Sequence, residues 1–375
     1  MWPRILGVIL SAMTILSACT VARSGTPTPA ATRPPALSLA TITALDQLAT
    51  EALASNGAGL SIAVDERAQV VYAHGFGEAD IVANRPVHPE TPFAIASITK
   101  QFTAAAILQL VDKHRLTLDS TLSQLLPQGP IQDSRITLKM LLNHTSGIGN
   151  YTRGPDYLKL EPHDQSESTM LDFIASRPRQ FEPGESFAYN NSGYYLLGII
   201  LERVTGKPYG DYLMQHLVQP LGLMHTRYCG GGLSTPDGAA RYASGGAHSA
   251  SAAPVSTTVA FAAGGLCASA SDLLRWQYDL RTGHVVTPRD YAMMTGPTTA
   301  ADGKVIPYGF GLETDPVLEG DPFLAGHPAV WHDGGGPGVS SDLIKDDVGI
   351  AVLSNSDTVN ADAVASRVAQ LVLKK

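Results

Sequence analysis

Apolar residues recur at two different spacings along the chain, and the change between these spacings predicts its elements. Residues 41–54 have helical spacing, and two strands joined by a polar turn are predicted next, at 59–64 and 68–73. Short strands return near the C-terminus, at 308–312, 329–332, 338–344 and 349–354, before a closing helix at 360–373. The two ends of the chain are therefore expected to contribute strands to one sheet.

Helical spacing dominates the middle of the chain, where long loops rich in Gly, Pro and Ser separate the helices. Helices are predicted at 136–143, 194–204 and 271–280, the last with Ser271 or Asp272 near its cap. This order predicts an α+β fold, in which an antiparallel sheet built from both chain ends is flanked by helices and a mainly helical lobe is inserted. We assign residues 39–115 and 300–375 to an α/β domain and residues 116–299 to a helical domain.

The first 18 residues have the pattern of a targeting segment. Arg4 provides a positive charge, and the apolar run at 5–16 is too short to span a bilayer. The run ends in Leu-Ser-Ala-Cys, which resembles a bacterial lipobox and predicts cleavage before Cys19 and acylation of its sulfur. The alternative is an ordinary signal peptide with a chance cysteine. Residues 19–38 are rich in Pro and Thr and are predicted to form an extended tether.

Charge and cysteine content narrow the possible partners. The net charge of −8 argues against a nucleic-acid partner. Because Thr20 follows the lipobox cysteine, the resemblance to bacterial lipoproteins implies a lipid anchor on the periplasmic face of the outer membrane. The other cysteines are Cys229 and Cys267, and their spacing leaves open whether they pair. No Cys/His cluster has metal-ligand spacing, so we expect neither a metal nor another cofactor, and the oligomeric state is left open.

The first candidate for chemistry is a serine followed three positions later by a lysine, Ser97 and Lys100, at the start of a predicted helix. Three-residue spacing places both side chains on one helix face. A serine hydroxyl needs a base to take its proton before it becomes a good nucleophile. A lysine in a dry site near a helix N-terminus would be driven toward its neutral form and would then serve as that base. On its own, the pair also fits a surface lysine beside a capping serine.

Two further motifs carry candidate groups. Tyr189 and Asn191 precede a predicted helix, and in an extended loop their side chains face the same way. We expect the Tyr189 phenol to ionise more easily beside a lysine, while the Asn191 amide offers a donor and an acceptor. His332 ends a predicted strand that runs into glycines, including Gly334 and Gly335, and exposed glycine amides suit an oxyanion hole. Taken singly, each motif also fits an ordinary turn.

Together, Ser-Ile-Thr-Lys from Ser97, Tyr-Asn-Asn from Tyr189 and His-Asp-Gly from His332 resemble, in this order, the motifs of the serine β-lactamase-like hydrolases. That family includes class C β-lactamases, D-alanyl-D-alanine carboxypeptidases, D-aminopeptidases and related esterases. The likeness extends over nearly all of the chain after the tether. It implies a β-lactamase/transpeptidase-like fold and a serine hydrolase of the cell envelope that forms an acyl-enzyme on an ester or an amide.

The resemblance also implies a role for each motif residue. Ser97 is the acylated nucleophile, and Lys100 and Tyr189 share the proton transfers, with the choice of base left open. Asn191 positions the substrate amide or the lysine. The backbone N–H groups of Ser97 and Gly335 would form the oxyanion hole.

One departure from the family pattern narrows the substrate. β-Lactamases of this group usually carry Lys at the position of His332, where a cation suits the carboxylate of a β-lactam. Histidine is mostly neutral at pH 7, and Asp333 adds negative charge if it faces the site. We therefore expect weak or no β-lactamase activity and a peptidase, amidase or esterase acting on a small molecule or peptide. The alternative is a non-catalytic peptidoglycan-binding or sensor module with the same fold, which would need no activated hydroxyl.

Overall fold

The computed structural model describes residues 37–54, 58–243, 250–314, 329–336, 339–345 and 348–373. Residues 34–375 form one compact unit. The targeting segment, Cys19 and most of the tether lie outside the described residues, so these expectations stay predictions, as does the division into two domains. Among the described helices, none combines the length and apolar character needed to cross a bilayer.

The helices and strands of this unit follow one another in runs, with strands β1 to β4 before an unbroken series of helical elements from η1 to α9. The helical elements are α1 (Leu39–Leu53), the 3₁₀ turn η1 (Ala96–Ile98), α2 (Thr99–Asp112), α3 (Leu122–Leu125), α4 (Leu138–Leu142), α5 (Pro155–Leu160), α6 (Glu167–Ala175), α7 (Asn191–Thr205), α8 (Tyr209–Leu213), the π-helical turn η2 (Met214–Val218), α9 (Gln219–Leu221), α10 (Thr257–Gly264), α11 (Ala270–Arg281), α12 (Pro288–Thr295) and α13 (Ala361–Leu373). The strands are β1 (Gly59–Glu66), β2 (Gln69–Asp80), β3 (Arg85–Pro86), β4 (Phe93–Ala94), β5 (Arg227–Tyr228), β6 (Tyr242–Ala243), β7 (Ala250–Ser251), β8 (Leu266–Ala268), β9 (Thr298–Thr299), β10 (Val305–Ile306), β11 (Val330–Gly336), β12 (Val339–Lys345) and β13 (Val348–Ser354).

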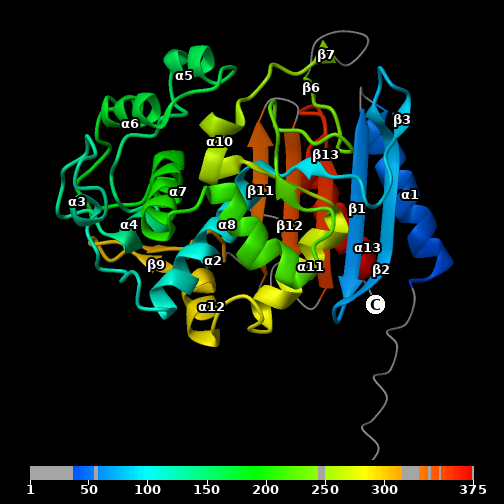
Figure 1. Cartoon of the computed structure of the whole chain (residues 1–375). Coiled ribbons are helices and arrows are strands. Elements are labelled where there is room, and N and C mark those ends of the chain that lie inside the picture. Colours follow the sequence, from blue (N-terminus) through cyan, green and yellow to red (C-terminus); the bar gives the residue numbers. More distant parts are fainter. Residues whose placement is uncertain are drawn as a thin grey trace, which may run out of the picture. The chain divides into compact units, whose positions relative to one another are not determined.

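The largest sheet has six antiparallel strands in the order β11-β12-β13-β1-β2-β3 (Figure 1). Within it, Val64 of β1 lies opposite Ile350 of β13 on one side and opposite Tyr72 of β2 on the other. Arg67 and Ala68, in the turn between β1 and β2, both have positive φ, which matches the twist of paired strands. The predicted α+β fold and the predicted sheet built from both chain ends are confirmed.

Alternate side chains of β1 enter two separate cores. Leu60, Ile62 and Val64 are buried in an apolar cluster with residues of α1 and α13, which pack on one face of the sheet. Ala63 belongs to a larger cluster that includes residues of α2 and α11, and α11 packs against β1 and β13. Because both faces are covered, every residue of β1 is buried.

The helix that follows η1, α2, is buried on almost all sides. Its residues from Thr99 to Leu108 are all buried, and the helix packs against α7, α8 and α10. A helix buried around its circumference is part of a core. Since Lys100 lies in the first turn of α2, a titratable group is held inside the protein.

The predicted strand at 308–312 is wrong. Tyr308 makes only an isolated bridge to Glu313. Gly311 has a φ of 76°, and a Cβ at that position would lie 2.8 Å from the carbonyl oxygen of Lys100. The segment therefore turns closely over α2 in a conformation that suits glycine, and it does not extend as a strand.

The cap of α11 also differs from the prediction. The hydroxyl of Ser269, and not Ser271 or Asp272, caps the helix by accepting a hydrogen bond from the N–H of Asp272 at 3.2 Å. The carboxylate of Asp272 instead accepts hydrogen bonds from the N–H of His225 at 2.7 Å and from the hydroxyl of Thr226 at 2.9 Å. These tertiary donors explain why Asp272 is not the cap.

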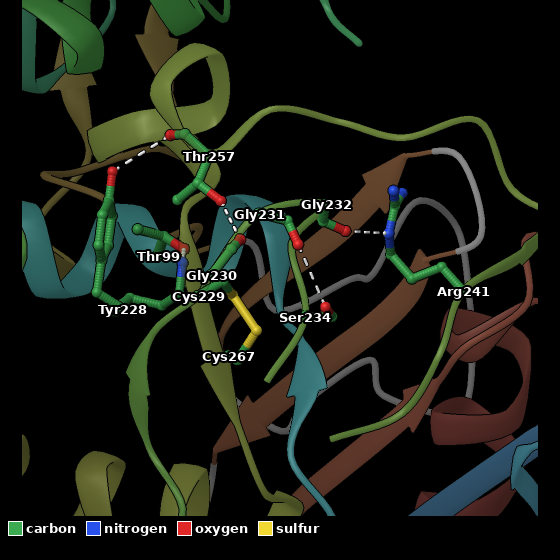
Figure 2. The surroundings of a disulfide bond; sticks show 11 residues. Thr99, Tyr228, Cys229, Gly230, Gly231, Gly232, Ser234, Arg241, Thr257 and Cys267 are labelled. Atoms are coloured by element: carbon green, nitrogen blue, oxygen red, sulfur yellow. Dashed lines mark hydrogen bonds between the residues drawn. A yellow bond between two sulfur atoms is a disulfide. The ribbon is translucent and has the colours of Figure 1, made fainter. Parts of the chain in front are cut away.

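A second sheet, in the order β4-β8-β5, contains one end of a disulfide bond. Cys267 of β8 is bonded to Cys229, which follows β5 (Figure 2). The pairing that the sequence left open is therefore present. Both cysteines pack in a small apolar cluster with Ala96 and Val339. The disulfide thus supports the segment that leads into Ser97.

Candidate active site

Ser97 is the central residue of η1, the single turn between β4 and α2. The preceding residue, Ala96, has a φ of 43°, a left-handed conformation that costs on the order of 1–3 kcal/mol for a residue other than glycine. The turn is anchored because the N–H of Ile95 donates to the carbonyl of Leu266 in β8 at 3.0 Å. Ser97 lines a cavity of about 250 Å³.

Lys100 is completely buried one turn after the serine. Its Nζ lies 2.9 Å from Ser97 Oγ, 2.8 Å from Asn191 Oδ1 and 2.8 Å from the carbonyl oxygen of Ala263. Burial lowers the pKa of Lys100 to about 7, although attraction to Asp333 opposes the shift. A large share of the amine is therefore neutral near pH 7.

The three partners of the Lys100 amine allow different hydrogen-bonding roles. Asn191 Oδ1 and the Ala263 carbonyl can only accept, so each takes one N–H of the amine in either protonation state. In the neutral amine the remaining tetrahedral position holds a lone pair, and this position faces the Ser97 hydroxyl. Lys100 is therefore arranged to take the serine proton while it keeps both other contacts.

A break in α10 brings the Ala263 carbonyl to Lys100. Phe261, inside this helix, has a φ of 40° and a ψ of −129°. The two carbonyls that follow the break point to α2, because Ala262 accepts from the Thr103 hydroxyl at 2.7 Å and Ala263 accepts from Lys100. Phe261 is thus a second residue with strained backbone beside the site, as is common where function fixes the geometry.

Asn191 is the first residue of α7, and Asn190 caps that helix. Asn191 Nδ2 donates to the Thr152 hydroxyl at 3.0 Å, and this hydroxyl donates to Asn150 Oδ1 at 3.0 Å. This chain of hydrogen bonds fixes the Asn191 amide with its oxygen toward Lys100, so Asn191 positions the lysine. Neither Thr152 nor Asn150 carried a signal in the sequence.

Tyr189 lies beside Lys100, whose Nζ is 4.9 Å from the centre of the phenol ring. The hydroxyl oxygen of Tyr189 is buried and makes no hydrogen bond of standard geometry with the described residues. Burial raises its pKa well above the usual value of 10, and the neighbouring Ser97 hydroxyl opposes this effect only in part. The expectation that this phenol ionises easily is therefore wrong, because burial outweighs the nearby amine.

His332 is completely buried on β11. Its Nδ1–H donates to the carbonyl oxygen of Asp333 at 2.6 Å, and its Nε2 accepts from the Tyr308 hydroxyl at 3.3 Å. Burial lowers the pKa of His332 to about 4; repulsion by Lys100 adds to the shift and attraction to Asp333 opposes it. The imidazole is therefore neutral at pH 7 and offers no cation to a substrate carboxylate.

Glycines at the end of β11 form part of the cavity wall. Gly335 and Gly336 line the same cavity as Ser97, and a Cβ on Gly335 would meet nothing within 4 Å. Gly334 is buried and pairs with Ser341 of β12. The structure brings Gly335 and Ser97 to one cavity, and the assignment of their N–H groups to an oxyanion hole stays a prediction.

Three segments far apart in the chain meet at this site: η1 with the first turn of α2, the loop before α7, and β11. The side chains that they bring together are Ser97, Lys100, Tyr189, Asn191 and His332. Ser97, Asn191 and Gly335 line the cavity, whereas the lysine is enclosed behind it. Within the described part of the chain, no group of His, Cys, Asp and Glu side chains could hold a metal ion.

His144 lies outside the three motifs and also contributes to the site. Its φ is 61°, and its Nδ1 accepts from the N–H of Asn190 at 3.1 Å. Its ring packs against those of Tyr189 and Tyr308, with centroid distances of 4.6 and 4.7 Å. The carbonyl of His144 also accepts a hydrogen bond from the N–H of Ala188 at 3.1 Å, so His144 holds the Tyr189 loop through both its backbone and its ring. The signal was the His-Thr-Ser-Gly turn at this position.

Comparison with known proteins gives a consistent set of relatives. The chain is 29% identical over 296 residues to penicillin-binding protein 4* of Bacillus subtilis, which covers 75% of this chain and 63% of that protein. It is 28% identical over 274 residues to a D-aminopeptidase of Gluconobacter oxydans, which covers 72% of this chain and 51% of that protein. The chain thus spans less than two thirds of the length of these curated relatives.

Among solved structures, a D-stereospecific amidohydrolase from Streptomyces sp. superposes with a TM-score of 0.74 at 25% identity, covering 89% of this chain and 99% of that chain. The sequence model of the beta-lactamase family matches residues 45–374. Both results confirm the resemblance and the fold that were inferred from the motifs. With nearly all of its described residues inside that match, the chain belongs to the beta-lactamase family.

Proposed function

We propose that this protein is a serine hydrolase that forms an acyl-enzyme on Ser97 and cleaves an ester or an amide. The observation that carries the proposal is the 2.9 Å contact between Lys100 Nζ and Ser97 Oγ, made by a completely buried lysine whose pKa burial lowers to about 7. Burying a charged amine costs free energy. Burial therefore favours the neutral form of Lys100, and the neutral amine is a base beside the Ser97 hydroxyl. Of the two candidate bases, Lys100 is favoured, because burial keeps the Tyr189 phenol neutral.

In the proposed acylation, neutral Lys100 takes the Ser97 proton while Oγ attacks the carbonyl carbon of the substrate. The carbonyl oxygen gains a negative charge, which the N–H groups of Ser97 and Gly335 would stabilise. When the carbonyl re-forms, the bond to the leaving nitrogen or oxygen breaks. The leaving group takes the proton from protonated Lys100, relayed by the Tyr189 hydroxyl. In deacylation, Lys100 takes a proton from water as the water oxygen attacks the acyl carbon. The bond between that carbon and Ser97 Oγ then breaks, and Oγ takes the proton back from Lys100, which frees Ser97 and the acid product.

The relatives suggest the class of substrate. Their names include a D-aminopeptidase and a D-stereospecific amidohydrolase, so we infer a small-molecule or peptide substrate cleaved in the manner of a peptidase, amidase or esterase. The neutral, buried His332 supports weak or no β-lactamase activity, because the carboxylate of a penicillin or cephalosporin would find no cation on β11.

The cellular location belongs to the same proposal. We infer that the enzyme acts in the cell envelope, in line with its similarity to a penicillin-binding protein. We further propose that a lipid on Cys19 anchors it, on the periplasmic face of the outer membrane. Metabolic labelling with a radioactive fatty acid tests the anchor: the label should enter the full-length protein and be absent from Cys19→Ser, and label retained by Cys19→Ser would contradict it.

A fluorophosphonate probe followed by intact mass measurement tests the hydrolase function. Wild-type protein should gain the mass of one phosphonyl group, and Ser97→Ala should gain none while keeping the same thermal melting curve. A panel of a short-chain aryl ester, a chromogenic cephalosporin and D-amino-acid amides then identifies the substrate. Folded wild-type protein that gains no mass would instead support a non-catalytic peptidoglycan-binding or sensor module.

A further inference from the structure

The cavity in front of Ser97 contains two charged side chains that the proposed reaction does not use. Within the described chain, Glu161 and Arg241 are the only charged residues that line it. Both are nearly buried, with exposed fractions of 5% and 9%. Buried charges are unfavourable unless they are paired or hydrogen-bonded, so the partners of each group indicate what the cavity is able to bind.

The guanidinium of Arg241 holds the main chain around the cavity. Its Nε donates to the carbonyl of Gly232 and its Nη2 donates to the carbonyl of Ala253, each at 2.9 Å; Figure 2 shows the first of these bonds. Burial lowers the pKa of Arg241, and attraction to Glu161 opposes the shift. Arg241 thus donates to main-chain carbonyl groups and is attracted to Glu161, so it is a poor candidate for binding a substrate anion.

Glu161 has fewer partners than a carboxylate is able to accept. It follows α5, and its Oε1 accepts from the Tyr157 hydroxyl at 2.6 Å. A carboxylate has about four acceptor positions, and Tyr157 supplies the one side-chain hydrogen bond that Glu161 receives from the described residues. The carboxylate therefore presents further acceptor positions and a negative charge to the cavity that Ser97 also lines.

We propose that the Glu161 carboxylate binds a protonated primary amine of the substrate, so that the enzyme prefers amides or esters of amino acids with a free amine. The proposal rests on the proposed hydrolase function and names the substrate class of the same cavity. An ammonium group brings one positive charge and three donors, which match the open acceptors of a buried carboxylate. A substrate anion would instead meet the charge of Glu161.

The wild-type protein alone provides the first test. Each enantiomer of phenylalaninamide is compared at pH 7 with 3-phenylpropanamide, which lacks only the amine, and released ammonia gives kcat/KM. We expect kcat/KM for the preferred enantiomer to exceed kcat/KM for the amine-free amide by about 10- to 100-fold. This factor corresponds to the usual contribution of a hydrogen bond to a charged group. Equal kcat/KM values for the amine and amine-free amides would overturn the proposal.

Two variants assign the preference to the carboxylate. Glu161→Gln keeps the size of the side chain and removes its charge, and it should lower the ratio of the two kcat/KM values to about threefold or less. Tyr157→Phe is the matched control, because it removes the hydroxyl that donates to Glu161 but leaves the carboxylate, and it should keep most of the ratio. If Glu161→Gln does not fold, Glu161→Met tests the same loss of charge. A folded variant without the carboxylate that retains the full ratio would contradict the assignment.

Labelling of Ser97 by the fluorophosphonate separates this proposal from the hydrolase function. If the fluorophosphonate labels Ser97 and unlabelled wild-type enzyme hydrolyses both kinds of amide equally, the hydrolase function stands and the proposed role of Glu161 is lost. Folded wild-type protein with no label on Ser97 would overturn the hydrolase function itself, and the amine preference with it.

Discussion

Ser97 separates two regions of opposite character. The proton-transfer side contains Lys100 and the Tyr189 hydroxyl, with the neutral His332 beside them. All three groups are buried, and burial shifts the pKa of each toward its neutral form. The cavity side, which includes Gly335 and Glu161, lines an accessible space. Exclusion of water therefore sets the protonation states on one side of Ser97, while recognition of a substrate on the other side depends on groups left open to a ligand.

The largest expected effect comes from removing the base of the proton-transfer side. Lys100→Met keeps the length of the side chain and abolishes proton transfer, so kcat/KM should fall on the order of 10³-fold. Initial rates with an amide substrate and the rate of fluorophosphonate labelling measure the loss. Lys113→Met, an exposed lysine at the end of the same helix, is the control and should be unchanged. Activity within tenfold of wild type would remove Lys100 from the role of base.

The pH dependence of kcat/KM tests the protonation state of the buried side of Ser97. Only neutral Lys100 accepts the Ser97 proton, and its pKa is about 7, so kcat/KM for an amide without an ionisable amine, such as 3-phenylpropanamide, should rise with pH below 7 and level off above it. From pH 7 to pH 5 the expected loss is on the order of 50-fold, since each unit below the pKa costs about tenfold. His332 has a pKa of about 4 and does not change charge across this range. A flat profile from pH 5 to 8 would show that another group is the base.

A smaller effect is expected from His144, which holds the Tyr189 loop without lining the cavity. His144→Phe keeps an aromatic ring and leaves the N–H of Asn190 without its acceptor, so kcat should fall about tenfold with little change in KM. Phe187→Leu is the control. Phe187 packs edge-on against His144 with ring centroids 6.0 Å apart, and among the described contacts it makes no hydrogen bond to a site residue. A change in KM alone would assign His144 to substrate binding instead of positioning.

The disulfide should affect stability more than activity. Replacing Cys229 and Cys267 by serine removes the covalent support of the cavity side, and the free energy of unfolding should fall by about 2–4 kcal/mol. Urea unfolding with and without dithiothreitol measures the change, and dithiothreitol should have no effect on the double variant. We expect kcat/KM at 25 °C to change by less than about threefold, because the cysteines do not line the cavity. An unchanged urea midpoint would contradict the structural role.

The sequence predicted the parts of the molecule that depend on local spacing. Alternation at both chain ends predicted the sheet, helical spacing predicted α1, α7 and α13, and three-residue spacing predicted that Ser97 and Lys100 meet. The order of the three motifs then indicated the family, which the match over residues 45–374 confirms.

Properties set by burial and by distant contacts were not accessible from spacing. The pKa of Tyr189 depends on how deeply the fold encloses its hydroxyl, and the sequence showed only that a lysine would be near. The turn at Gly311 depends on how closely it approaches the carbonyl of Lys100. Glu161 stood in no motif, because its importance comes from a cavity that several distant segments enclose.

The position of β1 between β13 and β2 has a consequence for synthesis. A ribosome makes Val64 early, but its partner Ile350 appears only when almost the whole chain has been completed. The first hairpin must therefore wait with one hydrogen-bonding edge unpaired, and such long-range pairing is slow. A prematurely terminated chain that lacks β13 would leave this edge of β1 exposed to other molecules. Chaperones and proteases should therefore recognise nascent or truncated copies at the unpaired edge of β1.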